Sequence, residues 1–243
     1  MEGKYFEMPF TVLKLCGRWE KLMNGLSSNT PQSPRNAFLD VYGRTVAAFF
    51  QVRTEDGLLI ALPEQFTARL DVHLKKYLAI GKASLDKTNL HAFLVAGKGP
   101  QEGTCISIPE KNCGISLSEF PPHDMERMGE PEFLEWRIEN GLSLQGVEFD
   151  SEMIMNTDWQ DAVSFTKGCF LGQEIAVKVT RRGRPPKRLV RMAFVSEPMR
   201  ATRGDFEVGE VKSKCLSEKR GKWIAYCSIP NDGLEIDGGK IIG

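Results

Sequence analysis

The chain has 243 residues, 41% of them hydrophobic, and this length suffices for one large domain or two modest ones with a substantial core. Lysine and arginine total 32, as do aspartate and glutamate, so the overall charge predicts no general attraction to nucleic acid or to a membrane surface. The N-terminus lacks a basic segment followed by an apolar run, and no stretch approaches the roughly 20 apolar residues that cross a bilayer. These features predict a globular, cytoplasmic protein without membrane contact.

Three short strands are predicted first along the chain, at 37–41, 45–52 and 58–62, with turn residues between them. This pattern is typical of an antiparallel meander. The run 64–80 then places apolar residues at helical spacing, which predicts a helix that covers the sheet. His73 neighbours this apolar stripe, so we interpret it as a residue on the flank of the helix and not as a catalytic base.

Two further strands are predicted at 90–96 and 104–108, separated by a glycine-rich turn at 97–100. Pro131 is suited to the first turn of a helix, which is predicted to continue to Asn140 and to end at Gly141. A shorter helix is predicted at 173–178. Strands mixed with occasional helices indicate an α+β fold.

A basic, proline-interrupted linker at 181–188 predicts a domain boundary. The main domain would comprise residues 1–183. Residues 184–243 contain β-type segments, such as 189–195 and 223–228, and predict a small C-terminal β-barrel or sheet, reduced in size.

The six cysteines form no C-x-x-C pair, which argues against disulfides and against a zinc or iron–sulfur site of ordinary spacing. The three histidines are isolated in sequence, and no metal site is predicted. Cys169 is the best candidate for a functional cysteine, because Gly168 and Gly172 permit a tight loop that turns it outward. Lys167 would favour its thiolate, as would the N-terminus of a helix that begins at Gln173. The alternative is that Cys169 is a small buried hydrophobic residue.

The segment Lys167-Gly168-Cys169-Phe170-Leu171-Gly172-Gln173-Glu174 resembles the signature of the YgfZ family of folate-binding proteins, relatives of the glycine-cleavage T-protein. A second segment, 136–141 with Leu144-Gln145-Gly146, resembles the Arg-x-Glu-x-Gly stretch that the two groups share. Gly17 and residues 24–29 form a third, weaker match, in which Arg18-Trp19 stand where an acidic residue is usual. The resemblance extends from about residue 10 to about residue 230, which is most of the chain.

The resemblance implies a T-protein-like, folate-binding body of antiparallel sheets with helices, followed by a small C-terminal β-barrel. The implied cofactor is tetrahydrofolate or a one-carbon derivative, with Glu139 as the carboxylate that contacts the pterin. Arg137 would contact the ligand or hold this region by a salt bridge. The remaining candidates for cofactor binding are the aromatic walls Trp136 and Phe170, together with Gln173.

The implied function is support for the assembly or repair of iron–sulfur clusters in client enzymes, including tRNA-modifying enzymes, with Cys169 and Lys167 as the reactive pair. Such a protein need not be a stand-alone enzyme. Two alternatives remain open. One is a tetrahydrofolate-dependent aminomethyltransferase of the T-protein type, although the T-protein motif normally lacks the cysteine. The other is a tRNA-binding module that uses the basic stretch 178–191.

Overall fold

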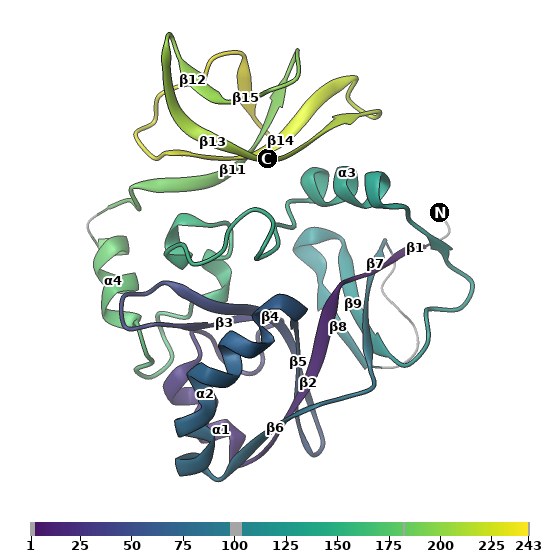
Figure 1. Cartoon of the computed structure of the whole chain (residues 1–243), viewed down its shortest axis with the longest axis vertical. Helices are drawn as coiled ribbons and strands as arrows, with labels where there is room; N and C mark the ends of the chain where they lie inside the picture. Colours follow the sequence, from purple (N-terminus) through teal and green to yellow (C-terminus); the bar gives the residue numbers. More distant parts are fainter. Residues whose placement is uncertain (1–2, 98–103, 182, 243) are drawn as a thin grey trace. The chain divides into compact units, whose positions relative to one another are not determined.

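The computed structural model describes residues 3–97, 104–181 and 183–242 (Figure 1). The chain divides into two compact units, one formed by residues 1–128 and 161–175, the other by residues 129–160 and 176–243. The second unit contains the predicted C-terminal region together with α3 and the segment that follows it. The domain boundary after residue 183 stays a prediction. Residues 98–100 of the predicted glycine-rich turn lie outside the described residues.

One five-stranded sheet of the first unit has the strand order β3-β4-β5-β2-β6, and all of its neighbouring strands are antiparallel. Its strands are β2 (Phe10–Gly17), β3 (Arg35–Leu39), β4 (Thr45–Thr54), β5 (Gly57–Pro63) and β6 (Ala83–Lys87). The predicted meander is therefore confirmed as β3, β4 and β5. The strand β2 was not predicted from the sequence, yet it lies between β5 and β6.

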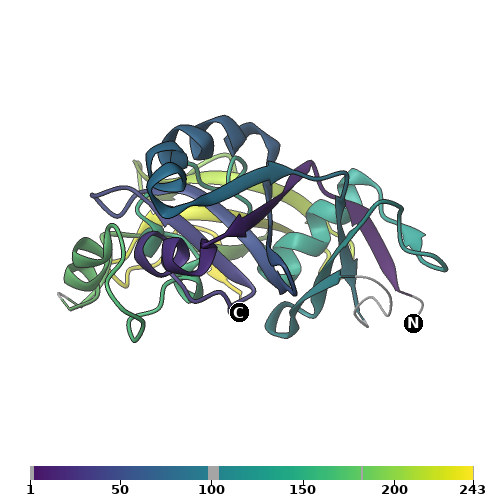
Figure 2. The same cartoon turned by 90° about the horizontal axis from the view of Figure 1, so that it is seen from below.

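Two helices cover one face of this sheet (Figures 1 and 2). They are α1 (Trp19–Leu26) and α2 (Thr67–Gly81), and a 3-10 turn, η1 (Glu64–Phe66), leads into α2. Leu70 and Leu74 lie one turn apart on α2 and are fully buried, so the predicted helix and its covering role are confirmed. His73 lies beside the rings of Phe38 and Tyr77, and burial lowers its pKa.

The second sheet of the first unit has the order β10-β1-β7-β9-β8, and only β1 and β10 pair in parallel among its described strands. The strands are β1 (Lys4–Glu7), β7 (His91–Ala96), β8 (Thr104–Ile108), β9 (Cys113–Ser118) and β10 (Glu126–Arg127), and a 3-10 turn, η2 (Pro109–Lys111), joins β8 to β9. The predicted strands at 90–96 and 104–108 are confirmed. Both pair with β9, which was not predicted.

The second unit contains α3 (Glu130–Asn140), which packs against two strands of a five-stranded antiparallel sheet. As predicted, α3 ends at Gly141, whose φ of 70° is favourable for glycine. The sheet has the order β12-β13-β14-β11-β15. Its strands are β11 (Lys187–Phe194), β12 (Ala201–Arg203), β13 (Phe206–Ser217), β14 (Lys222–Pro230) and β15 (Gly239–Ile241). The described strands confirm the α+β class, whereas they show an open sheet and not a closed small barrel.

The remaining helical segments flank the predicted cysteine loop and the stretch before it. They are the 3-10 turns η3 (Ile154–Asn156) and η4 (Gln160–Ala162) and the helix α4 (Gln173–Arg181). The predicted helix at 173–178 is confirmed and extends three residues further. Among the described helices, none is long and apolar enough to span a membrane.

Candidate functional site

Cys169 lies in the loop that precedes α4, and its side chain is exposed. All six cysteines fall within the described residues, and the other five are buried or half-buried. Burial raises the pKa of both Cys113 and Cys227 to about 12 and that of Cys215 to about 11. Cys169 is thus the cysteine best placed to react with a partner in solution.

The two glycines of the loop have different structural roles. Gly172 has a φ of +84°, and a Cβ atom built there would lie 2.5 Å from the backbone oxygen of Asp40. Glycine is therefore required at this position for both conformation and space. Gly168 has no positive φ, and an added Cβ would meet no atom within 4 Å. Of the two glycines, Gly172 thus uses the conformational freedom of glycine, and Gly168 does not.

The ammonium group of Lys167 is directed to the C-terminal end of α1. Its Nζ donates to three backbone oxygens, those of Ser27 at 2.6 Å, Asn29 at 3.1 Å and Met23 at 3.2 Å. An ammonium group has three N–H donors, so these carbonyls engage all of them. Burial lowers the Lys167 pKa to about 8. The structure thus assigns Lys167 the role of fixing the loop to α1, and its predicted action on the thiolate of Cys169 stays a prediction.

Phe170 anchors the loop from its other side. Its side chain is only 7% exposed, and the Lys167 ammonium lies 5.3 Å from its ring centroid. Leu171 packs on the core of the first unit, and its N–H donates to the Gly25 oxygen of α1 at 3.2 Å. Gln173 is half-buried at the start of α4. The half-buried Lys167 and the buried Phe170 therefore fix the backbone on the two sides of Cys169, while its thiol stays exposed.

A buried polar network holds the stretch before the loop. Ser28 Oγ donates to the Ala162 oxygen at 2.6 Å, and Asn29 Nδ2 donates to the Asp161 oxygen at 2.8 Å. Arg35, whose side chain is 1% exposed, lies 2.9 Å from both carboxylate oxygens of Asp161. These contacts join segments about 130 residues apart. Arg35 and Asp161 were not among the predicted site residues, because no local pattern marks such a distant pair.

The other predicted site residues lie on α3 in the second unit. Arg137 is buried and donates to both oxygens of Glu148 at 3.0 Å each, and to the Leu142 oxygen at 3.1 Å. Ser213 Oγ and the Leu144 N–H also donate to the Glu148 carboxylate. The salt-bridge role considered for Arg137 is therefore what the structure shows.

Glu139 forms a bidentate ion pair with Arg220, which follows β13. Arg220 Nε lies 2.6 Å from Oε1 and Nη2 lies 2.8 Å from Oε2, while Ser217 Oγ donates to Oε1 at 3.1 Å. The hydrogen bond from Arg220 is the main cause that lowers the Glu139 pKa, and Ser217 acts in the same direction. Trp136 lies one turn earlier on α3 and is half-buried. The structure thus brings together Trp136, Arg137 and Glu139 in one unit, and Lys167, Cys169, Phe170 and Gln173 in the other.

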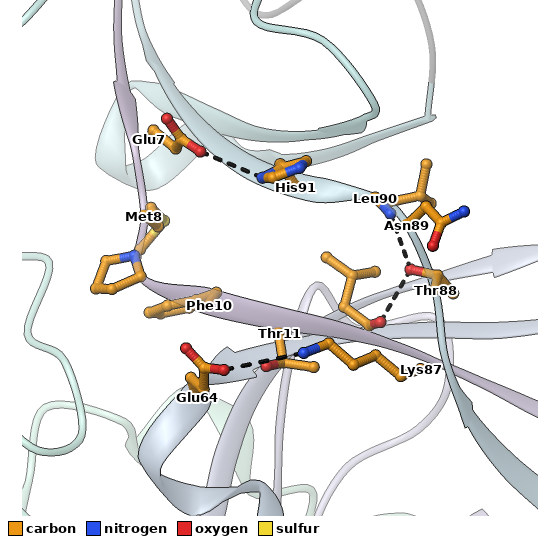
Figure 3. A pocket seen from close by; sticks show the side chains of 12 residues that line it. Glu7, Met8, Phe10, Thr11, Glu64, Lys87, Thr88, Asn89, Leu90 and His91 are labelled. Carbon is orange, nitrogen blue, oxygen red and sulfur yellow. Dashed lines mark hydrogen bonds and ion pairs between the residues drawn. The ribbon is translucent and has the colours of Figure 1, made fainter.

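A polar pocket of about 310 Å³ lies in the first unit, where the links β1–β2 and β6–β7 meet (Figure 3). Its ionisable side chains pair with each other: His91 Nδ1 lies 3.2 Å from Glu7, and Lys87 Nζ lies 3.9 Å from Glu64. None of the predicted site residues lines this pocket, so we assign it no chemistry. Within the described parts of the chain, no group of three or more His, Cys, Asp or Glu side chains could hold a metal ion.

Comparison with known proteins supports the architecture at the level of the fold. No family model and no curated protein matches the sequence. The structure is similar to that of the glycine cleavage system aminomethyltransferase T from Bartonella henselae, with a TM-score of 0.79 and 13% sequence identity. The match covers 99% of this chain and 84% of that one. The chain therefore has a T-protein-like fold, and the resemblance to the YgfZ family stays a prediction.

Proposed function

We propose that this chain is a folate-binding protein of the YgfZ type that acts in the cytoplasm and supports the assembly or repair of iron–sulfur clusters in client enzymes, including tRNA-modifying enzymes. The observation that carries the proposal is the exposed thiol of Cys169, held in a T-protein-like fold by a loop whose backbone is anchored on both sides. A structural cysteine needs no such exposure, since free cysteines are usually buried.

Cys169 would act as a transient ligand to an iron atom of the client's cluster. Thiolate sulfur is a soft ligand that suits iron–sulfur chemistry, and clusters are ordinarily held by several cysteines. The described residues offer no set of three ligands, so the client would supply the remaining ones. The iron–sulfur cluster would then be the substrate of this protein and not its resident cofactor.

Glu139 would hold the pterin of a tetrahydrofolate. Its carboxylate already accepts two parallel N–H donors from the planar guanidinium of Arg220, and the N–H edge of a pterin presents the same bidentate pattern. The residue type and geometry thus fit the ligand, provided that Arg220 gives way to it. The bound folate would supply one-carbon chemistry, while Trp136 would offer an aromatic surface beside the ring.

Anaerobic calorimetry with tetrahydrofolate tests this site. We expect micromolar binding by the wild type, at least a tenfold loss in Glu139→Ala and no loss in Glu135→Ala, which removes a carboxylate one turn away on α3. Arg220→Gln should bind more tightly than the wild type, because it frees the carboxylate. Equal binding by the wild type and Glu139→Ala would contradict the assigned site, and no binding by the wild type would contradict folate binding.

The role of Cys169 is tested by the activity of iron–sulfur enzymes in cells that depend on this protein. Cys169→Ser should lose client activity while it keeps its melting temperature and folate affinity. Cys105→Ser, at a half-buried cysteine of β8, should keep client activity. Full activity of Cys169→Ser would refute the role of the thiol.

A second candidate function is a tetrahydrofolate-dependent aminomethyltransferase, favoured by the similarity to the aminomethyltransferase T structure. It predicts turnover of an aminomethyl donor that survives Cys169→Ser and is lost in Glu139→Ala. The proposed function predicts no such turnover, so one assay with these two variants separates the candidates.

A further inference from the structure

A second pocket of the first unit opens between α1 and α2 and has a volume of about 270 Å³. Its apolar lining includes Leu22 and Leu26, which lie one turn apart on α1 and are both buried. From α2 it is lined by Tyr77, which is half-buried, and by Ile80, which is 81% exposed. This combination provides an apolar floor with an uncovered apolar side chain at its edge.

Of the residues that the structure describes, two cations and no acidic side chain line the same pocket. They are Arg18 and Lys21, both exposed. Among the described residues neither side chain has an ion-pair partner, and the neighbouring Glu20 pairs with Arg53 at 2.8 Å. The pocket therefore fits a ligand in which an anionic group is joined to an apolar group.

Gly25 lines the pocket within α1, and nothing in the fold requires glycine there. Its φ is not positive, and a Cβ atom added to it would meet no atom within 4 Å. Glycine is among the poorest helix formers, so a residue with a side chain would favour α1. A bound ligand that needs the space in front of Gly25 accounts for the glycine.

We propose that this pocket binds the C-terminal residue of a partner polypeptide. A branched or aromatic side chain would fill the apolar floor, and the free α-carboxylate would lie between Arg18 and Lys21. The exposed Ile80 favours a polypeptide as occupant. Its side chain extends the apolar surface beyond the pocket, where the residues that precede the C-terminal residue of a polypeptide would lie.

The pocket and the Cys169 loop share one helix. The Gly25 oxygen accepts from the Leu171 N–H at 3.2 Å, and the Met23 oxygen accepts from Lys167 Nζ at 3.2 Å. A partner bound at the pocket would thus contact the helix that anchors the loop. The binding proposal itself does not depend on folate binding or on the role of Cys169.

The first test uses an acetylated pentapeptide of serine and alanine that ends in phenylalanine with a free carboxylate, measured by NMR titration of the full chain. We expect a Kd of about 0.1–1 mM, the range of roughly −4 to −5.5 kcal/mol. The C-terminal amide and the double variant Arg18→Gln, Lys21→Gln should each weaken binding at least tenfold. Lys75→Gln, which removes a cation of α2 outside the pocket, should bind like the wild type. Equal binding of acid and amide would overturn the proposal.

A second variant separates binding from folding. Gly25→Ala should keep or raise the melting temperature and weaken peptide binding at least tenfold, because its methyl group enters the pocket. Asn24→Ala, at the preceding residue of α1, should leave the affinity unchanged. Wild-type affinity in Gly25→Ala would overturn the proposal. So would binding of 3-phenylpropionate as tight as that of the peptide, since a free carboxylic acid would then suffice as occupant.

Discussion

The Nζ atom of Lys167 lies 2.6 Å from the backbone oxygen of Ser27, a residue 140 positions earlier in the chain. Ser27 is the C-cap of α1, so Lys167 places a cation at the negative end of that helix, beside its last carbonyl groups. The same ammonium group also binds the Met23 and Asn29 oxygens. One side chain thereby satisfies a helix end and fixes the position of the loop that carries Cys169.

Lys167→Met should lower the free energy of unfolding by about 1–3 kcal/mol, because methionine keeps most of the side-chain length and removes every hydrogen bond to the carbonyls. Lys178→Met, at an exposed lysine of α4, should stay within about 0.5 kcal/mol of the wild type. Urea denaturation of the two variants is the measurement. A loss no larger in Lys167→Met than in Lys178→Met would contradict the capping role.

The lowered pKa of Lys167 predicts a pH-dependent stability. The folded amine titrates at about 8 and the unfolded amine near 10.5, so between these values the unfolded chain holds more protons. Protonation of the folded amine therefore lowers the free energy of unfolding. This effect is absent above pH 10.5 and is complete once the pH has fallen below 8. The stability of the wild type minus that of Lys167→Met should rise from pH 8 to pH 10. A flat or falling difference would show that the folded pKa is not lowered.

Local patterns were enough to predict much of the fold. The meander β3-β4-β5 is marked by turn residues between its strands, and α2 by Leu70 and Leu74 at helical spacing. The strand β2 and the helix α1 were missed. In β2 four of the eight residues are buried and three of these, 11–13, are consecutive, so the strand lacks the alternation typical of a half-exposed strand, and α1 is short and contains Gly25.

The candidate site could be predicted only in part. Glycines close to Cys169 predicted a loop that exposes the thiol, and the structure shows Cys169 exposed. The partner of Lys167 was not predictable, because its acceptors are backbone oxygens on another element and carry no side-chain signal. Arg220 was not recognised as the partner of Glu139, because the two are 81 residues apart and no local pattern links them.

The two loop glycines should respond oppositely to alanine. Gly172→Ala should lower the free energy of unfolding by about 2 kcal/mol or more, since it combines a positive φ with a Cβ that would lie 2.5 Å from the Asp40 oxygen. Gly168→Ala should be neutral or stabilise by up to about 1 kcal/mol, because the space is open. Thermal unfolding of both variants checks this. A Gly168→Ala variant as unstable as Gly172→Ala would refute the loop geometry.

Breaking the buried ion pair of Arg137 and Glu148 should lower the free energy of unfolding more than replacing both residues with apolar ones. Glu148→Leu alone leaves the 4%-exposed guanidinium without its carboxylate and should lower the free energy of unfolding by about 3–5 kcal/mol. The double variant Arg137→Met, Glu148→Leu should recover part of this loss. Glu20→Gln, which breaks an exposed pair with Arg53, should cost no more than about 1 kcal/mol. A loss of unfolding free energy in the double variant that equals the sum of the losses in the two single variants would show that Arg137 and Glu148 do not interact.

Thiol reactivity distinguishes Cys169 from the other cysteines of the folded chain. With Ellman's reagent at pH 8, we expect one thiol per chain to react fast, because the other five are buried or half-buried and burial keeps Cys113 and Cys227 protonated with a pKa of about 12. Cys169→Ser should remove the fast phase, whereas Cys16→Ser should keep it. Denaturant should make all the remaining thiols react. A fast phase that persists in Cys169→Ser would assign the reactive thiol to another cysteine and remove the main support for the proposed function.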